Sequence, residues 1–196
     1  MKIEKNPELQ KQYYKGTWVS CKGNGDPIIL IHGVGLDHHM WNLQVSALKK
    51  SFRVIAYDII GHGKSIQPPG QRFLNDFVEQ LHQLMENLKL KDSIIVGFSL
   101  GGLIAREFSI QYPKMAKKLI LISTVFQRTL DQQKAVLNRY LIAKKGHSVD
   151  QIDPAITRWF SPKYIASNPK TIKNIKQTLS SNDPIGYLKA YKVFSH

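Results

Sequence analysis

Residues 96–102 read VGFSLGG and place Ser99 between two glycines in a Gly-x-Ser-x-Gly frame. The stretch follows a short apolar run, residues 93–96, and opens a predicted helix from about Leu100 to Gln111. A sharp turn from strand into helix lifts a serine oxygen clear of the backbone. Backbone atoms are crowded in such a turn, so the positions two residues before and after the serine must be glycine. The helix dipole favours negative charge at the same point. The stretch therefore predicts a nucleophilic serine.

Three further apolar runs have the features of buried parallel strands. Each is short, rich in β-branched or aliphatic residues and bounded by Gly, Pro or Asp. They are PIILI at 27–31, FRVIAY at 52–57 and KLILI at 118–122. An amphipathic helix is predicted between them from apolar residues at helical spacing, namely Phe73, Phe77, Leu81, Leu84 and Leu88. Alternating strands and helices predict an α/β fold with a mostly parallel sheet and flanking helices, whose chemistry lies beyond the carboxyl ends of the strands.

The sequence HGVG, residues 32–35, follows the first of these strands. Its glycines allow the backbone to come close to the serine turn. We expect the backbone N–H groups of Val34 and Leu100 to form a two-donor oxyanion hole. His32 closes a strand before a loop, so we interpret it as a residue that holds the turn by local hydrogen bonds and not as the catalytic base.

The sequence DIIGHGKS, residues 58–65, ends like a phosphate-binding loop. Such a loop needs a glycine five residues before its Gly-Lys pair. Asp58 occupies that position and would place an anion where a phosphate should lie. We therefore exclude nucleotide binding, expect Asp58 to accept hydrogen bonds from the turn that follows it, and interpret His62 as a turn residue.

The chain is strongly basic, with a formal net charge of +14, but only six of its 28 basic residues are arginines. Planar bidentate recognition of phosphates and bases favours arginine. We therefore expect a lysine-rich solvated surface and no nucleic-acid partner. Such a surface can also attract an anionic small-molecule substrate.

The remaining composition indicates a cytoplasmic protein. Cys21 is the single cysteine, which excludes an intramolecular disulfide and fits a reducing compartment. No run of about 18 apolar residues predicts a membrane span, and the N-terminal residues lack the apolar core of a secretion signal. We expect no membrane contact, no metal and no cofactor, and leave the oligomeric state open.

The pattern changes after about Phe126. We expect residues 1–126 to form the sheet-bearing core and residues 127–196 to form a helical cap over its active edge. The cap segment carries 12 Lys and Arg against 4 Asp and Glu and shows no clear strand. Aromatic residues near the motifs are predicted to wall the substrate pocket, with ordinary packing as the alternative for each. They are Phe98, Phe126 and Trp159.

Taken in order, HGVGLDHHMW (32–41), YDIIGHGKS (57–65) and GFSLGGLIAREF (97–108) resemble the α/β-hydrolase superfamily over residues 15–126. Within it they are similar to the 3-oxoadipate enol-lactonase and carboxylesterase group, as are RWFSP (158–162) and NDPIGYLKAYKVF (182–194). The resemblance implies hydrolysis of a small carboxylic ester or lactone through an acyl-enzyme on Ser99.

A serine nucleophile needs a base, and the base needs an orienting acid. In this superfamily the acid and the histidine follow the serine along the chain, after strands that come later than the cap. The resemblance therefore implies that the chain ends at His196 before the last core strands. Two alternatives stay open: a related reaction such as carbon–carbon bond hydrolysis or perhydrolysis, and a non-catalytic fragment or binding scaffold of the same fold.

Overall fold

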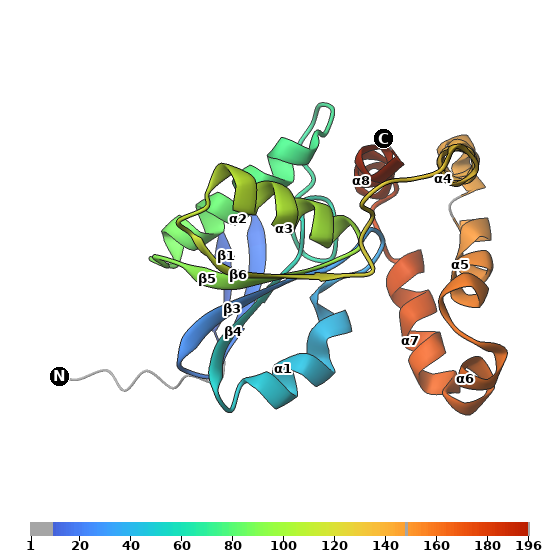
Figure 1. Ribbon diagram of the computed structural model, residues 1–196. Helices are drawn as coiled ribbons and strands as arrows, with labels where there is room; N and C mark the ends of the chain where they lie inside the picture. The colour runs from blue at the N-terminus through green and yellow to red at the C-terminus, as the bar shows by residue number, and fades with distance from the viewer. Residues whose placement is uncertain (1–9, 148, 196) are drawn as a thin grey trace.

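The fold is built on one six-stranded sheet with the strand order β1-β2-β4-β3-β5-β6. It is seen in a computed structural model that describes residues 10–147 and 149–195 (Figure 1). The strands are β1 (Gln10–Tyr14), β2 (Thr17–Lys22), β3 (Asp26–Ile31), β4 (Phe52–Tyr57), β5 (Ser93–Phe98) and β6 (Ala116–Ile122). The helices are η1 (His38–Trp41), α1 (Asn42–Leu48), α2 (Leu74–Asn87), α3 (Leu100–Gln111), α4 (Leu130–Ile142), η2 (Ala143–His147), η3 (Val149–Gln151), α5 (Ile152–Trp159), α6 (Pro162–Ser167), α7 (Pro169–Ser180) and α8 (Pro184–Ser195).

Four strands of the sheet run parallel. β3 lies in the middle, where Ile29 is aligned with Ile55 of β4 on one side and with Ile95 of β5 on the other. β6 pairs with the far side of β5. These strands coincide with the four apolar runs, and α2 and α3 coincide with the two predicted helices. The prediction of an α/β fold with a mostly parallel sheet is confirmed.

The antiparallel hairpin of β1 and β2 and the short helix α1 were not anticipated. β2 joins the sheet by pairing antiparallel with β4, and Val19 lies opposite Tyr57. β1, with the sequence QKQYY, is added outside β2. A strand with so few apolar residues shows little alternation of apolar and polar residues, so the sequence pattern does not reveal it. The strand forms because its backbone pairs with β2.

The core has two layers, one on each face of the sheet. Ile29 and Ile31 of β3 point to the face that α2 and α3 cover, whereas Ile28 and Leu30 point to the face that α1 covers (Figure 1). This alternation follows from the period of two along a strand. Central strands buried on both faces need apolar residues at every position, and this requirement produces the unbroken PIILI and FRVIAY runs.

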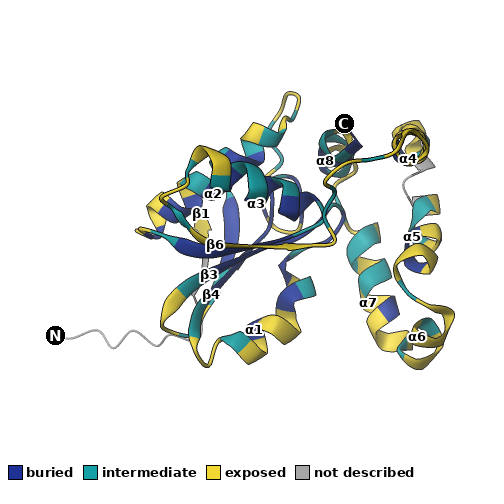
Figure 2. Ribbon diagram, viewed as in Figure 1, coloured by how far each residue is buried: buried dark blue, intermediate teal, exposed yellow. Residues whose placement is uncertain are grey.

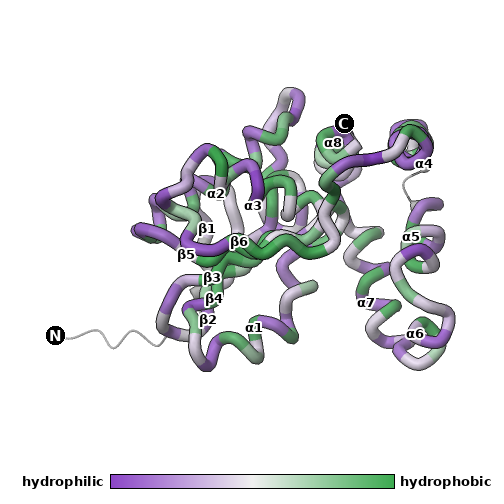
Figure 3. Tube along the Cα trace, in the orientation of Figure 1, coloured by the Kyte–Doolittle hydropathy of each residue, from purple (hydrophilic) through white to green (hydrophobic). Residues whose placement is uncertain are grey.

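β6 is a parallel strand, but the expectation that it is buried is wrong. It pairs with β5 alone, and Leu119, Ile120, Leu121 and Ile122 are between 37% and 45% exposed. Figure 2 shows β6 as exposed, and Figure 3 shows the same strand as apolar. The local pattern of KLILI predicts a central strand, but β6 has no strand beside its outer edge among the described residues.

The helices from α4 to α8 gather beside the carboxyl ends of the parallel strands (Figure 1). Polar contacts join them to the sheet-bearing part: Asn182 Nδ2 donates to the carbonyl of Gly35 at 2.7 Å, and Lys189 Nζ donates to the carbonyl of Pro68 at 3.2 Å. Ala190 of α8 is fully buried in the main core cluster. Among the described residues, no helix combines the length and the apolar character that crossing a membrane requires.

The exposed edge of β6 predicts self-association of the 196-residue chain. A row of free backbone N–H and C=O groups with apolar side chains is a template for pairing with another chain, and a charge in such an edge opposes pairing. We expect the chain to associate at micromolar concentration and Ile120→Lys to increase the monomer fraction, as measured by sedimentation velocity. Leu43→Lys is the matched control, because Leu43 is 81% exposed on α1, away from this edge. A monomeric wild-type chain with a sharp calorimetric unfolding transition contradicts the prediction.

Candidate active site

The backbone at Ser99 is strained. Ser99 stands between β5 and α3 with φ +55° and ψ −117°, a region that residues with a side chain rarely adopt and that costs on the order of 1–3 kcal/mol. Its N–H donates to the carbonyl of Ile122 at 3.0 Å, and its own carbonyl accepts from the Thr124 hydroxyl at 2.8 Å. The end of β6 and the residues just after it therefore hold the serine in this conformation.

The glycines on either side of Ser99 are required by close backbone contacts. A Cβ atom on Gly97 would collide with the carbonyl of Gly101, and a Cβ atom on Gly101 would collide with the carbonyl of Ile31. The serine turn is thus pressed against the end of β3, where the HGVG stretch begins. Any side chain at these two positions would push the turn away from the sheet.

Ser99 opens into a cavity of about 230 Å³ between the sheet and the cap helices. The sheet-bearing part contributes Ser99 and Val34, and helices or turns of the cap contribute the rest of the wall. The cap residues that line the cavity are Arg139, Gln151, Ile152, Ala155, Arg158, Trp159, Leu179, Ser180, Asn182, Pro184, Tyr187, Tyr191 and Phe194. This volume lies just below the usual range of small-molecule pockets, about 300–1,000 Å³, so the cavity suits a small ligand, and its walls are both polar and apolar.

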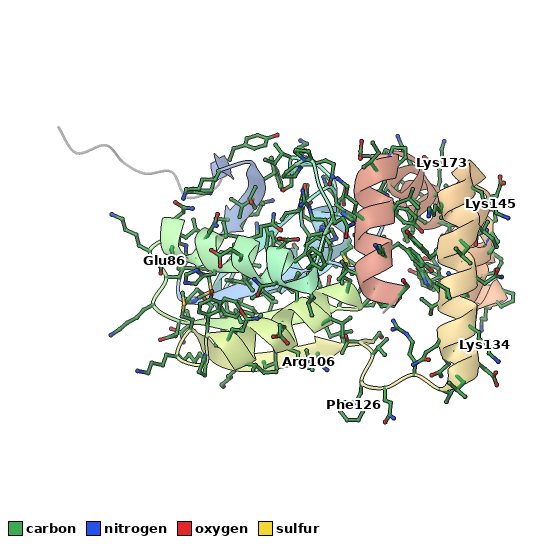
Figure 4. The ribbon with its side chains drawn as sticks, turned by 90° about the horizontal axis from the view of Figure 1, so that it is seen from above. Glu86, Arg106, Phe126, Lys134, Lys145 and Lys173 are labelled. Carbon is green, nitrogen blue, oxygen red and sulfur yellow. The ribbon has the colours of Figure 1, made fainter. Side chains whose placement is uncertain are left out.

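The predicted site residues lie either in the cavity wall, in the core or on the exposed surface. Ser99, Val34 and Trp159 line the cavity, and Leu100 is fully buried as the first residue of α3. Phe98 is half-buried and packs with the second core cluster. Phe126 is 91% exposed and lines a separate hollow of about 620 Å³, on the connection between β6 and α4 (Figure 4). The structure therefore does not bring Phe98 and Phe126 to the wall of the cavity beside Ser99.

His32 and Asp58 form a buried polar network behind the serine turn. His32 Nδ1 lies 2.8 Å from the carbonyl of Gly33, and its Nε2 accepts from the N–H of Ile59 at 3.0 Å. This pattern requires the neutral tautomer with its proton on Nδ1. Burial lowers the pKa of His32 and outweighs the opposing charge of Asp58. His32 thus holds two strand ends together, as the sequence indicated.

Asp58 accepts hydrogen bonds from two loops. Its Oδ2 accepts from the N–H of Lys64 at 2.9 Å, which confirms the expected contact with the following turn. Its Oδ1 accepts from the N–H of His38 at 2.8 Å and lies 2.7 Å from His38 Nδ1. Burial acts to raise the pKa of Asp58, but the His38 hydrogen bond and the neighbouring His32 outweigh it and hold the pKa below its usual value.

The pairing of His38 with Asp58 could not be anticipated from local sequence. A histidine beside a buried carboxylate is the arrangement by which an acid orients a catalytic base. His38, however, packs against Trp18 with the two rings tilted by 35° and their centroids 3.8 Å apart, and it does not line the cavity beside Ser99. Within the described part of the chain, no histidine nitrogen makes a hydrogen bond to the Ser99 hydroxyl.

One group of described residues has the composition of a metal site. Ligand atoms of Asp37, His38 and His39 all lie within 4.8 Å of one another. Their existing contacts already account for this closeness: Asp37 caps η1 by accepting from the N–H of His39 at 2.9 Å, and Asp58 holds His38. The expectation that the chain uses no metal stays a prediction.

Arg139, Tyr187 and Tyr191 also line the cavity, and none of them was predicted to do so from the sequence. Tyr187 and Tyr191 lie within NDPIGYLKAYKVF, but nothing local in that stretch indicates which side chains face the serine. Burial strongly raises the pKa of Tyr187, so its hydroxyl stays protonated at neutral pH. The cavity wall opposite Ser99 thus consists of arginine cations and neutral groups.

The buried histidine His62 predicts a pH dependence of stability. Burial lowers the pKa of His62 to about 3, whereas a histidine in the unfolded chain titrates near 6.5. Between these pH values the His62 imidazole binds a proton in the unfolded state but stays neutral in the folded state. The free energy of unfolding therefore falls as pH falls from about 6.5 towards 3. His62→Gln should lower this slope by up to about 1.4 kcal/mol per pH unit, as measured by urea unfolding at several pH values.

His39→Gln is the control for this measurement, because the His39 side chain is 57% exposed. The change of slope in His62→Gln should exceed the change in His39→Gln. The slope, and not the stability at one pH, is the readout, because His62→Gln also changes packing. An equal slope in wild type and His62→Gln would contradict the assignment of this acid sensitivity to His62.

Comparison with known proteins places this geometry in a family. The alpha/beta hydrolase fold family matches residues 26–159. The chain is 31% identical over 174 residues to (E)-2-((N-methylformamido)methylene)succinate hydrolase of Acinetobacter baylyi, covering 89% of this chain and 65% of that protein. The chain thus spans less than two thirds of that relative's length.

Two solved structures have the same fold. The enol-lactonase of Burkholderia xenovorans LB400 is 26% identical with a TM-score of 0.85, over 92% of this chain and 71% of that chain. A thermophilic esterase of Thermogutta terrifontis, solved with malate bound, is 28% identical with a TM-score of 0.85, over 92% and 67%. The strained serine turn, the parallel sheet and these matches agree, and the chain belongs to the α/β-hydrolase fold family.

Proposed function

We propose that Ser99 is the nucleophile of a hydrolase that cleaves small carboxylic esters or lactones. The observation that carries the proposal is the conformation of Ser99, which is held in a strained turn and opens into the cavity between sheet and cap. Strain of this kind persists where the surrounding structure enforces it, and it is concentrated at functional sites. Relatives named as hydrolase, esterase and enol-lactonase support the reaction class.

The reaction proceeds in two steps. The Ser99 oxygen attacks the carbonyl carbon while a base takes its proton, and the carbonyl oxygen becomes an oxyanion. The backbone N–H groups of Val34 and Leu100 donate to that oxyanion. The alcohol or enol oxygen then leaves with a proton from the same base, and water releases the acyl group from Ser99.

We propose that the base is supplied from outside the described residues. Within the described part of the chain, no histidine bonds to Ser99, and the neutral His32 and His62 are bound to backbone groups. The curated relative is longer than the stretch that this chain matches. The activity is therefore proposed for the protein with its base present, and for residues 1–196 we expect a preformed but inactive nucleophile.

The names of the relatives also suggest a substrate class. One is named for a substituted succinate, another for an enol-lactone, and the esterase structure holds malate. Small acids of this kind fit a cavity of about 230 Å³. We propose a small ester or lactone that carries a carboxylate, attracted by the positive charge of the chain.

A binding scaffold without catalysis is the competing function. The lack of a base near Ser99 among the described residues favours it. Carbon–carbon bond hydrolysis and perhydrolysis would use the same serine, and a panel of ester, lactone and diketone substrates separates them from ester cleavage.

A fluorophosphonate probe tests the nucleophile. Without the proton transfer that activates its hydroxyl, Ser99 should be labelled slowly or not at all in the 196-residue chain. A chimera that adds the part of the Acinetobacter hydrolase lying C-terminal to the matched stretch should label about 10²–10⁴-fold faster, the usual contribution of a general base. Ser99→Ala in the chimera should abolish labelling, as read by in-gel fluorescence and peptide mapping.

The short chain provides its own control. Rapid labelling of Ser99 in residues 1–196 would show that a base lies within them, and variants His38→Gln and His62→Gln would then identify it. A folded chimera that does not label would argue for the scaffold, with circular dichroism confirming that its fold is intact.

A further inference from the structure

Two arginines from different cap helices face the cavity beside Ser99. Arg139 comes from α4 and is half-buried, and Arg158 comes from α5 and is exposed at the mouth of the cavity that it lines. No acidic residue lines this cavity within the described ranges 10–147 and 149–195. The ion pairs among these described residues do not include Arg139 or Arg158, so neither guanidinium group is paired with a carboxylate in them.

The positive charge in this wall is uncompensated. Partial burial lowers the pKa of Arg158, and the nearby charge of Arg139 lowers it further. Both effects disfavour a cation, yet an arginine stays protonated at neutral pH because its ordinary pKa is so high. Like charges held together in a partly desolvated wall are unfavourable. An anion that enters the cavity relieves this repulsion.

Each guanidinium group is held in place by one neutral acceptor. Arg139 Nε donates to the hydroxyl of Tyr191 at 3.0 Å, and Arg158 Nη1 donates to the carbonyl of Pro154 at 3.0 Å. A guanidinium group has five N–H donors in a planar fork that matches a carboxylate. Most donors of both groups therefore remain for a ligand, and their side chains are already ordered.

We propose that Arg139 and Arg158 form a carboxylate-binding subsite, which holds an acid group of the substrate at a distance from the ester or lactone carbonyl that Ser99 attacks. This inference rests on the proposed function and deepens it. The substrates are then half-esters or lactones of small dicarboxylic acids, with one acyl group at Ser99 and the free carboxylate at the arginines. Tyr191 acts as a positioning residue through Arg139.

Binding of succinate to the unaltered 196-residue chain tests the subsite, because it requires neither the base nor turnover. Isothermal titration calorimetry at low ionic strength compares succinate with succinamide, its neutral counterpart. We expect succinate to bind and succinamide to bind at least about tenfold more weakly. Arg139→Gln and Arg158→Gln should each raise the Kd for succinate about tenfold, because each removes charge-assisted hydrogen bonds.

Lys134→Gln is the matched control. Lys134 is exposed on α4, the helix that carries Arg139, and it does not line the cavity (Figure 4). Its loss removes the same charge from the same helix, so the Kd should change less than twofold if the subsite is local. An equal loss of affinity in Lys134→Gln would show that a diffuse field attracts the anion, and the proposal would be overturned.

The contribution of Tyr191 is tested by a double-mutant cycle. Tyr191→Phe should weaken succinate binding in the wild-type chain and have no further effect in Arg139→Gln, because the hydroxyl acts through that arginine. If Arg139→Gln unfolds, as judged by circular dichroism, then Arg139→Lys keeps the charge without the planar fork and should show an intermediate Kd. Arg158→Gln tests the subsite independently, since the hydrogen bond that Arg158 makes among the described residues goes to a carbonyl of its own helix and not to Tyr191.

The results separate this inference from the proposed function. Equal, weak binding of succinate and succinamide to a folded chain overturns the subsite, even if the chimera labels at Ser99 with the uncharged probe. Succinate binding that depends on both arginines supports the subsite even if the chimera fails to label. Failure to label would then contradict only the proposed catalytic role of Ser99.

Discussion

The strained turn at Ser99 is the constraint on which the rest of the site depends. A residue with a side chain adopts φ +55° here because β5 ends and α3 begins without a connecting loop, and because Ile122 and Thr124 bond to both sides of its backbone. The carbonyl groups of Gly101 and Ile31 occupy the space that side chains at Gly97 and Gly101 would need. Contacts with the parallel sheet therefore hold Ser99 in the strained conformation that exposes its side chain to the cavity.

The same sheet edge determines what surrounds the serine. Because the carboxyl ends of β3, β4 and β5 lie side by side, Val34, Asp58 and Ser99 follow three neighbouring strands. The network of His32, His38 and Asp58 then ties the loops together behind the turn. This network explains buried charged and polar groups that would otherwise be costly, since each has a hydrogen-bonding partner of suitable character.

In the proposed function, helices α4 to α8 determine which substrate is recognised. The sheet side contributes the Ser99 hydroxyl and, as proposed, the backbone N–H groups of Val34 and Leu100, which suit any acyl group. Arg139 and Arg158 of the cap add the only charged side chains among the described residues that line the cavity. A cap that differs from one relative to another can thus direct a common nucleophile to different substrates, as expected when function resides in a site and not in a fold.

Local patterns in the sequence were enough to predict β3, β4, β5, α2, α3 and the serine turn, because each depends on the period of its own apolar residues or on crowding within a few residues. Contacts between distant segments were decided by the tertiary structure. These include the pairing of His38 with Asp58, the exposure of β6 and of Phe126, and the meeting of Arg139 and Arg158 beside Ser99. No local period encodes them, because they depend on how strands are ordered and how the cap helices fold back over the sheet edge.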